Sequence, residues 1–219
     1  MSKSRLLLVH SNPLNHLISV PPAYTPATGP WPVLCFLHGF MEAAPMAIQQ
    51  ALTLHGPLRQ DNPPLVTDRF IVVAPQLPAP GGDVWFRYAD AVQRIVRELQ
   101  QYYRGDPRRT YLTGFSFGGN GVLDLALAQP EFWAALWAVD LTRVPAEPQR
   151  PVWLSLRQQH PQTSDFIGHL QLLRAEPDPQ GDRLYTVSGR DHVDSATTAY
   201  RDDRIYGWLL TKQLLPDNT

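Results

Sequence analysis

Short, almost unbroken apolar runs recur along the chain, separated by segments rich in glycine and proline. Runs of this kind, bounded by turn residues, are typical of strands buried on both faces inside a parallel sheet. Longer segments with apolar residues three and four positions apart indicate amphipathic helices. The pattern predicts strands over residues 6–9, 17–20, 33–37, 70–74, 109–113, 135–139, 152–156 and 184–187, and helices over 86–103, 118–129, 164–174 and 195–210.

Strands alternate with helices through most of this pattern. The alternation predicts an α/β fold with a mostly parallel sheet of about eight strands and helices on both faces. A chain of 219 residues has room for one such unit, and we expect a single domain over residues 1–219. The predicted elements leave no insertion long enough for a lid domain.

Composition narrows the functional classes. Apolar residues make up 43% of the chain and charged residues 18%, which is enough to build a sizeable core. The formal net charge of −1 provides no basic field for nucleic acid or an anionic membrane. No apolar run approaches a membrane span or a secretory signal, so we expect a cytoplasmic protein without a membrane partner. Because Cys35 is the only cysteine, we expect no internal disulfide, no cysteine-based zinc site and no iron–sulfur cluster.

A Gly-x-Ser-x-Gly sequence at residues 114–118 connects a predicted strand to a predicted helix. In that context the motif forms a nucleophile elbow: its glycines allow a turn too tight for larger side chains, and the serine hydroxyl is lifted clear of the backbone. A chance match at such a junction is rare. Ser116 is therefore the candidate nucleophile.

A serine hydroxyl attacks efficiently only when a base removes its proton, and for an elbow of this kind the histidine follows the serine in the chain. His192 stands in a polar loop directly after the last predicted strand. Parallel sheets present their chemistry at the carboxyl ends of the strands. We therefore select His192 as the base and expect His160 and His169 to be solvated surface residues.

The oxyanion of a tetrahedral intermediate needs two positioned donors. The backbone N–H of Phe117, directly after the serine, supplies one, and the loop after the third strand supplies the other. That loop reads His38-Gly39-Phe40, so the N–H of Phe40 is the second candidate. His38 precedes Ser116 in the chain, and we expect it to support the loop.

With these motifs the chain resembles the α/β-hydrolase superfamily, in particular its small lid-less esterases and the group of predicted peptidases and polyhydroxybutyrate-depolymerase-like esterases. The resemblance runs through most of the chain. It is most specific over residues 106–119, which look like the elbow strand and turn of those enzymes, and residues 205–210 are similar to their closing helix. The resemblance implies hydrolysis of a small-molecule ester or thioester through an acyl-enzyme, without a cofactor.

The acid of the expected triad is where the chain departs from this family. The family aspartate follows the seventh strand, and the matching segment here, residues 153–160, holds no carboxylate. Asp140, at the end of the sixth strand, stands where some lipases of the same fold have their acid, and we place it first. Asp165 is the alternative, although a carboxylate in a first helical turn also has a purely structural role. The last options are Asp191, Asp194 or a dyad without an acid.

These residues predict a serine hydrolase with Ser116 as nucleophile and His192 as base. Trp85 enters the long helix after a glycine-rich loop, and we expect it to form part of a pocket wall. An apolar, unguarded pocket favours short or medium acyl chains. The same machinery would serve an acyltransferase or a peptidase, and the missing family acid leaves a non-catalytic binding protein of this fold as a further alternative.

Overall fold

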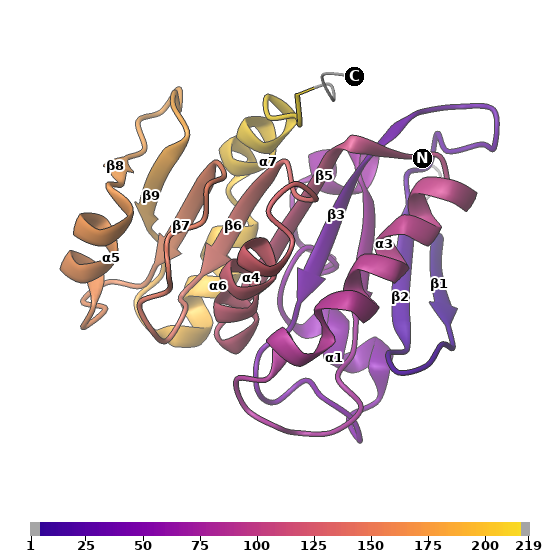
Figure 1. Cartoon of the computed structure of the whole chain (residues 1–219), viewed down its shortest axis with the longest axis horizontal. Helices are drawn as coiled ribbons and strands as arrows, with labels where there is room; N and C mark the ends of the chain where they lie inside the picture. The colour runs from indigo at the N-terminus through magenta and orange to yellow at the C-terminus, as the bar shows by residue number, and fades with distance from the viewer. Residues whose placement is uncertain (1–4, 216–219) are drawn as a thin grey trace.

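A nine-stranded sheet forms the centre of the computed structural model, which describes residues 5–215 (Figure 1). The strand order is β1-β2-β4-β3-β5-β6-β7-β9-β8. The pairs β1–β2 and β2–β4 are antiparallel, and all other neighbouring pairs are parallel. The strands are β1 (Arg5–Val9), β2 (His16–Val20), β3 (Trp31–Leu37), β4 (Ile71–Pro75), β5 (Gly105–Phe115), β6 (Ala135–Val139), β7 (Val152–Leu156), β8 (Leu173–Arg174) and β9 (Arg183–Val187).

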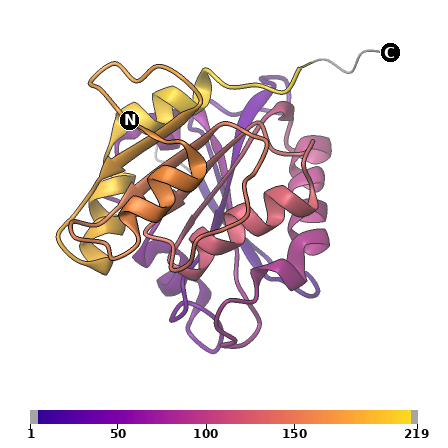
Figure 2. The same cartoon turned by 60° about the vertical axis from the view of Figure 1, so that its left-hand side comes forward.

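Helices cover both faces of the sheet, as Figure 1 and the turned view in Figure 2 show. α3, α4 and α5 contribute to the apolar cluster on one face, and α1, α2, α6 and α7 contribute to the cluster on the other. A single 3₁₀ turn, η1, leads into α3. The bounds are α1 (Ile48–Leu54), α2 (Pro64–Arg69), η1 (Trp85–Tyr88), α3 (Ala89–Tyr102), α4 (Phe117–Ala128), α5 (Thr163–Leu170), α6 (His192–Tyr200) and α7 (Asp203–Leu210).

The apolar runs are explained by burial on both faces. In β3, Val33, Cys35 and Leu37 belong to the cluster beneath α3–α5, whereas Leu34 and Phe36 belong to the cluster on the opposite face. Successive side chains of a strand point to opposite faces, so a strand covered on both sides must be apolar at every position.

The predicted strands are all present, and β6 and β7 have the predicted bounds. The mostly parallel sheet with helices on both sides confirms the predicted fold class, and no lid domain covers the described residues. The ninth strand, β8, contains only two residues and pairs with β9. A run that short carries no periodicity by which it could have been recognised.

The closing helix was predicted as one element over residues 195–210 and is two helices. Asp202 interrupts it, because its side chain accepts the backbone N–H of Arg204 and begins α7. An aspartate at this position satisfies a donor that the first helical turn leaves free. The apolar periodicity continues across the break, which is why the pattern alone predicted a single helix.

The helix predicted over residues 164–174 ends earlier, at Leu170. Gln171 adopts a left-handed backbone conformation with φ of 52° and stops α5. Residues 173–174 then leave the helical path and form β8. Neither α1 nor α2 was predicted, since each is too short to show a clear helical repeat.

Within residues 5–215, no helix combines the length and the apolar character needed to span a bilayer.

Candidate active site

Ser116 occupies the sharp turn between β5 and α4, with φ of 58° and ψ of −121°. Its backbone N–H donates to the carbonyl oxygen of Val139, at 2.9 Å, which ties the turn to the neighbouring strand β6. A Cβ atom on Gly114 would lie 2.3 Å from the Gly118 carbonyl oxygen, and one on Gly118 would lie 2.0 Å from the Leu37 carbonyl oxygen. Both glycines are therefore needed for a turn this tight, as the elbow motif predicts.

His192 begins α6, and its imidazole faces the serine. Its Nε2 atom lies 2.9 Å from Ser116 Oγ. Asp191 caps the helix by accepting the backbone N–H groups of Val193 and Asp194, so the capping turn fixes the place from which the imidazole projects. The ring also packs on Phe115, with centroids 4.7 Å apart.

Asp140 lies on the other side of the imidazole. The Nδ1 atom of His192 donates to Asp140 Oδ2 at 2.5 Å. Asp140 follows β6 directly, has φ of 44°, and is fully buried. The structure thus brings together the serine, the histidine and the first-placed acid of the sequence prediction.

The other acid candidates are engaged elsewhere. Asp165 is exposed in the first turn of α5. Asp191 binds backbone N–H groups at the start of α6, and Asp194 pairs with Arg190. Of the four carboxylates considered from sequence, Asp140 is the one that contacts His192 in the described residues.

Two residues of the loop after β7 surround Asp140 and were not anticipated. Arg157 donates its backbone N–H to Asp140 Oδ1 at 3.0 Å and its guanidinium Nη1 to Oδ2 at 2.5 Å. His160 is 6% exposed, donates Nε2–H to the Leu141 carbonyl oxygen, and lies 3.9 Å from Asp140 Oδ1. The prediction that His160 is solvated is therefore wrong, whereas His169 is exposed as expected.

The pKa of Asp140 reflects a balance of opposing effects. Burial acts to raise the pKa of this carboxyl group, because it disfavours the charged form. The hydrogen bonds from His192 and Arg157 outweigh burial and place the pKa below its ordinary value. The group is therefore a carboxylate at neutral pH, and it can orient and stabilise the imidazole.

The loop after β3, residues 38–40 (the oxyanion loop), carries the candidate donor Phe40, and the other candidate donor, Phe117, begins α4. Phe40 and Phe117 lie beside each other, with ring centroids 5.9 Å apart in an edge-to-face arrangement. Gly39 comes close to Ser116, since a Cβ on Gly39 would lie 3.4 Å from Ser116 Cβ. The residues of both candidate donors are thus brought to one side of Ser116.

His38 supports this loop, as the sequence predicted. Its ring is fully buried, with Nδ1 donating to the Gly39 carbonyl oxygen and Nε2 accepting the backbone N–H of Leu77. Burial lowers the pKa of His38 to about 4, so the ring is neutral at pH 7. A neutral imidazole has one donor and one acceptor, and both are used here.

Trp85 is buried in the core and does not form the exposed pocket wall that the sequence led us to expect. It is fully buried, and its indole N–H donates to the His38 carbonyl oxygen at 3.0 Å. Its side chain also packs against Gly121 of α4, where a Cβ would come within 2.5 Å of Trp85 Cβ. The glycine-rich loop before it suggested exposure, but the tryptophan turns inward and fastens the oxyanion loop to the core.

A second carboxyl–histidine pair lies next to the loop and was also missed. Glu42 Oε1 is 3.4 Å from His55 Nε2, and both residues are buried. Burial raises the pKa of Glu42 and, with a smaller contribution from Arg59, lowers the pKa of His55 to about 4. The two pKa shifts reduce the charge that Glu42 and His55 carry close to Ser116.

A polar network ties the loops around the site to α4. Asn120 donates to Asp83 and Thr142, and its amide oxygen accepts the backbone N–H of Thr142. Arg143 bridges Asp83 and Asp124 at 2.7 and 2.5 Å. The segment that follows Asp140 is thereby held to the helix that follows Ser116.

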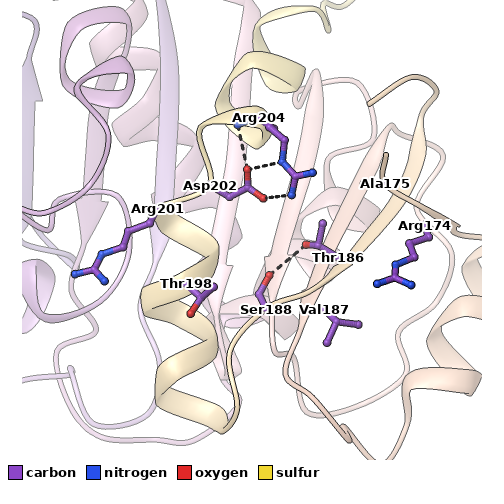
Figure 3. Close-up of a pocket in the computed structure, with 9 residues that line it drawn as sticks. All are labelled: Arg174, Ala175, Thr186, Val187, Ser188, Thr198, Arg201, Asp202 and Arg204. Atoms are coloured by element: carbon purple, nitrogen blue, oxygen red, sulfur yellow. Dashed lines mark hydrogen bonds and ion pairs between the residues drawn. The ribbon is translucent and has the colours of Figure 1, made fainter. Parts of the chain in front are cut away.

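A separate cavity of about 410 Å³ lies between the β8–β9 edge of the sheet and the junction of α6 with α7 (Figure 3). Two of its arginines are already paired: Arg204 with Asp202, and Arg201 with Asp61. Figure 3 shows the Arg201 side chain turned away from the other lining residues. None of the three residues that form the serine–histidine–aspartate arrangement lines this cavity. Within residues 5–215, no cluster of histidine, cysteine and carboxylate side chains is arranged to hold a metal ion.

Comparisons with known proteins place the fold. No protein-family model matches the chain, and no curated protein matches its sequence significantly. Solved structures do match: a thermostable esterase with a TM-score of 0.72 at 20% identity, over 96% of this chain and 63% of that one. A feruloyl esterase module from Clostridium thermocellum has a TM-score of 0.68 at 12% identity, over 93% and 87% of the two chains. An S-formylglutathione hydrolase from Agrobacterium tumefaciens has a TM-score of 0.65 at 14% identity, over 97% and 96%.

The chain spans less than two thirds of the thermostable esterase, and nearly the whole of the S-formylglutathione hydrolase. At these identities the likeness concerns the path of the backbone. The chain has the α/β-hydrolase fold.

Proposed function

We propose that this chain is a serine hydrolase that cleaves carboxylic esters or thioesters through an acyl-enzyme on Ser116. The observation that carries the proposal is the contact of His192 Nε2 with Ser116 Oγ at 2.9 Å, with Asp140 on the opposite ring nitrogen. Three residues from separate strand ends meet in the order that a serine triad requires. The esterase names of the structural neighbours agree with this reaction class.

In the first half of the reaction, Ser116 Oγ attacks the carbonyl carbon of the ester as His192 Nε2 takes the hydroxyl proton. Asp140 stabilises the imidazolium that forms. The backbone N–H groups of Phe117 and Phe40 hold the negative oxygen of the tetrahedral intermediate. His192 then gives its proton to the departing alcohol or thiol, and the acyl group stays on Ser116.

In the second half, water replaces the departing group. His192 accepts a proton from water as the water oxygen attacks the acyl carbon, and it returns that proton to Ser116 Oγ when the acid leaves. The alternative of a non-catalytic binding protein rested on the missing carboxylate after β7. The contact of Asp140 with His192 supports the catalytic proposal over that alternative.

The substrate we propose is a small ester with a short or medium apolar acyl group. Exposed apolar side chains flank the site: Phe40 and Met41 are 48% and 71% exposed beside the oxyanion loop, and Val193, next to His192, is 52% exposed. Such a surface binds apolar groups without enclosing them. With no lid over the described residues, long chains gain little further burial.

A fluorophosphonate probe tests the nucleophile. The wild-type chain should be labelled, and Ser116→Ala should lose labelling together with about 10⁶-fold of its esterase activity. Ser164→Ala, which removes an exposed serine of α5, is the matched control and should label normally. Labelling of Ser116→Ala at the wild-type rate, or none of the wild type, would contradict the proposal.

A series of p-nitrophenyl esters tests the substrate class. The value of kcat/KM should be highest for acetate to hexanoate and should fall for longer acyl chains. A rate that keeps rising to palmitate would point to an enclosed chain-binding tunnel and would overturn the open-site assignment.

A further inference from the structure

Arg157 directly follows β7, within the segment 153–160 where the family acid is expected, and it contacts Asp140 at the end of β6. Its backbone N–H and its guanidinium hold one oxygen each of Asp140, at 3.0 and 2.5 Å. The guanidinium shares Asp140 Oδ2 with His192 Nδ1, which is also at 2.5 Å. The arginine and the histidine are thus at most two hydrogen-bond lengths apart.

The position of these groups has an electrostatic consequence. Asp140 is fully buried, and Arg157 is the one permanently charged cation that contacts it within residues 5–215. Its positive charge already compensates the carboxylate before His192 gains a proton. A second positive charge on the imidazole then meets repulsion from the guanidinium, since both groups contact the same buried carboxylate oxygen.

Other titratable groups face His192 from several elements. His160, in the loop after β7, lies near the free side of Asp140. Glu42 and His55 approach from the loop after β3 and the end of α1, and both interact electrostatically with His192. On its own element, Asp191 is bound to backbone N–H groups and Asp194 is paired with Arg190. Arg157 differs from all of these because it touches the same carboxylate oxygen as the imidazole.

We infer that Arg157 is a positioning residue that locks the Asp140 carboxylate toward His192 and keeps His192 unprotonated, and so active as a base, to lower pH. The inference rests on the proposed serine-hydrolase function. The arginine does not touch the reacting atoms and acts through Asp140 alone.

Three substitutions separate charge from hydrogen bonding. Arg157→Gln can still donate to Asp140 without a charge, Arg157→Lys keeps the charge, and Arg157→Met keeps neither. The acidic limb of the pH profile of kcat/KM reports protonation of the base in the free enzyme. It should move to higher pH by about 1 unit in the Gln and Met variants and stay near the wild-type position in the Lys variant.

Orientation is read from kcat at the pH plateau. The backbone N–H of residue 157 continues to hold Asp140 Oδ1 in every variant. Arg157→Met should therefore lose only about tenfold in kcat, and Arg157→Gln should lose less, because its amide replaces the lost donor. KM should change little in all three variants, because Arg157 contacts Asp140 and does not touch the reacting atoms.

Arg183→Gln is the matched control, since Arg183 has nearly the same exposure as Arg157, 25% against 26%, and pairs with Glu147 at the opposite end of β9. The inference is overturned if the acidic limb of the kcat/KM profile of Arg157→Gln coincides with that of the wild type. It is also overturned if Arg183→Gln shifts this limb by the same amount as Arg157→Gln.

Near-UV circular dichroism and thermal melts check the folding of the variants. If Arg157→Gln and Arg157→Met both fail to fold while Arg157→Lys folds, Arg157 is purely structural and the inference is also overturned. If fluorophosphonate does not label the wild-type protein, the proposed serine-hydrolase function is wrong, which is a different outcome from failure of this inference.

Discussion

Two aspartate–arginine pairs of this molecule differ in geometry and in surroundings. Asp140 is fully buried between Arg157 and His192 at the carboxyl end of β6. Asp202 pairs with Arg204 through two hydrogen bonds of 2.9 and 2.6 Å beside the open cavity, with side chains 17% and 38% exposed. The second pair is closer to an ideal fork of two parallel bonds than the first.

The two carboxylates differ in their other hydrogen-bond partners. Asp202 also accepts the backbone N–H of Arg204 at the start of α7, so its hydrogen-bond partners belong to the helix that it caps. Asp140 joins residues from three strand ends, and one of them is the histidine that faces Ser116. Exposed ion pairs contribute at most about 1 kcal/mol to stability, whereas a buried carboxylate changes the chemistry of its neighbours. Chemistry is therefore expected at the buried pair.

The largest expected effect separates the two pairs directly. Asp140→Asn should lower kcat by about 10⁴-fold, because an amide cannot stabilise the imidazolium and favours the wrong tautomer of His192. Asp202→Asn keeps a good helix cap and should leave kcat unchanged, with a loss of at most about 1 kcal/mol in unfolding free energy. Steady-state kinetics and denaturant unfolding measure both variants.

An Asp140→Asn variant within tenfold of wild type would mean that His192 works without this acid. An Asp202→Asn variant with a large loss of kcat would mean that the cavity side of the molecule is coupled to the reaction.

The next effect contrasts a buried and an exposed histidine. Burial lowers the pKa of His38 to about 4, so between about pH 6.5 and 4 the unfolded chain binds a proton that the folded chain does not. The unfolding free energy therefore falls as the pH is lowered through this interval. Removing this group in His38→Gln should reduce the slope by up to about 1.4 kcal/mol per pH unit.

His169→Gln, on the exposed surface of α5, serves as the comparison and should leave the slope as it is. Urea unfolding between pH 4.5 and 7 supplies the slopes. Equal slopes in the wild type and His38→Gln would show that His38 takes up its proton in the folded state as easily as in the unfolded chain.

The smallest effect concerns two exposed apolar side chains. Met41, beside the oxyanion loop, is 71% exposed, and Leu173, in β8 at the far edge of the sheet, is 69% exposed. Met41→Ala should lower kcat/KM for p-nitrophenyl butyrate about threefold, which corresponds to about 30 Å² of lost apolar contact. Leu173→Ala should have no effect on the same reaction. Equal results for the two variants would remove Met41 from the substrate surface.

Much of the fold is local in origin and could be read from the chain. The run 33–37 is apolar at every position because β3 is covered on both faces, and the elbow at 114–118 is recognisable because only glycine fits on either side of Ser116. The break between α6 and α7 was missed because the apolar repeat continues past Asp202. Trp85 was misplaced because its neighbours in sequence suggest a loop, while its burial depends on His38 and Gly121.

The sequence by itself determined the candidate nucleophile, the candidate base and the kind of sheet that presents them, since these depend on a turn, a strand end and a short periodicity. Which of the candidate carboxylates contacts His192 was decided by tertiary structure. Asp140 lies 52 residues from His192 and 17 from Arg157, and the three meet because β6, β7 and β9 are neighbours in the sheet. Which carboxylate reaches a given imidazole depends on strand order and on the few ångströms between strand ends, and no pattern along the chain encodes those distances.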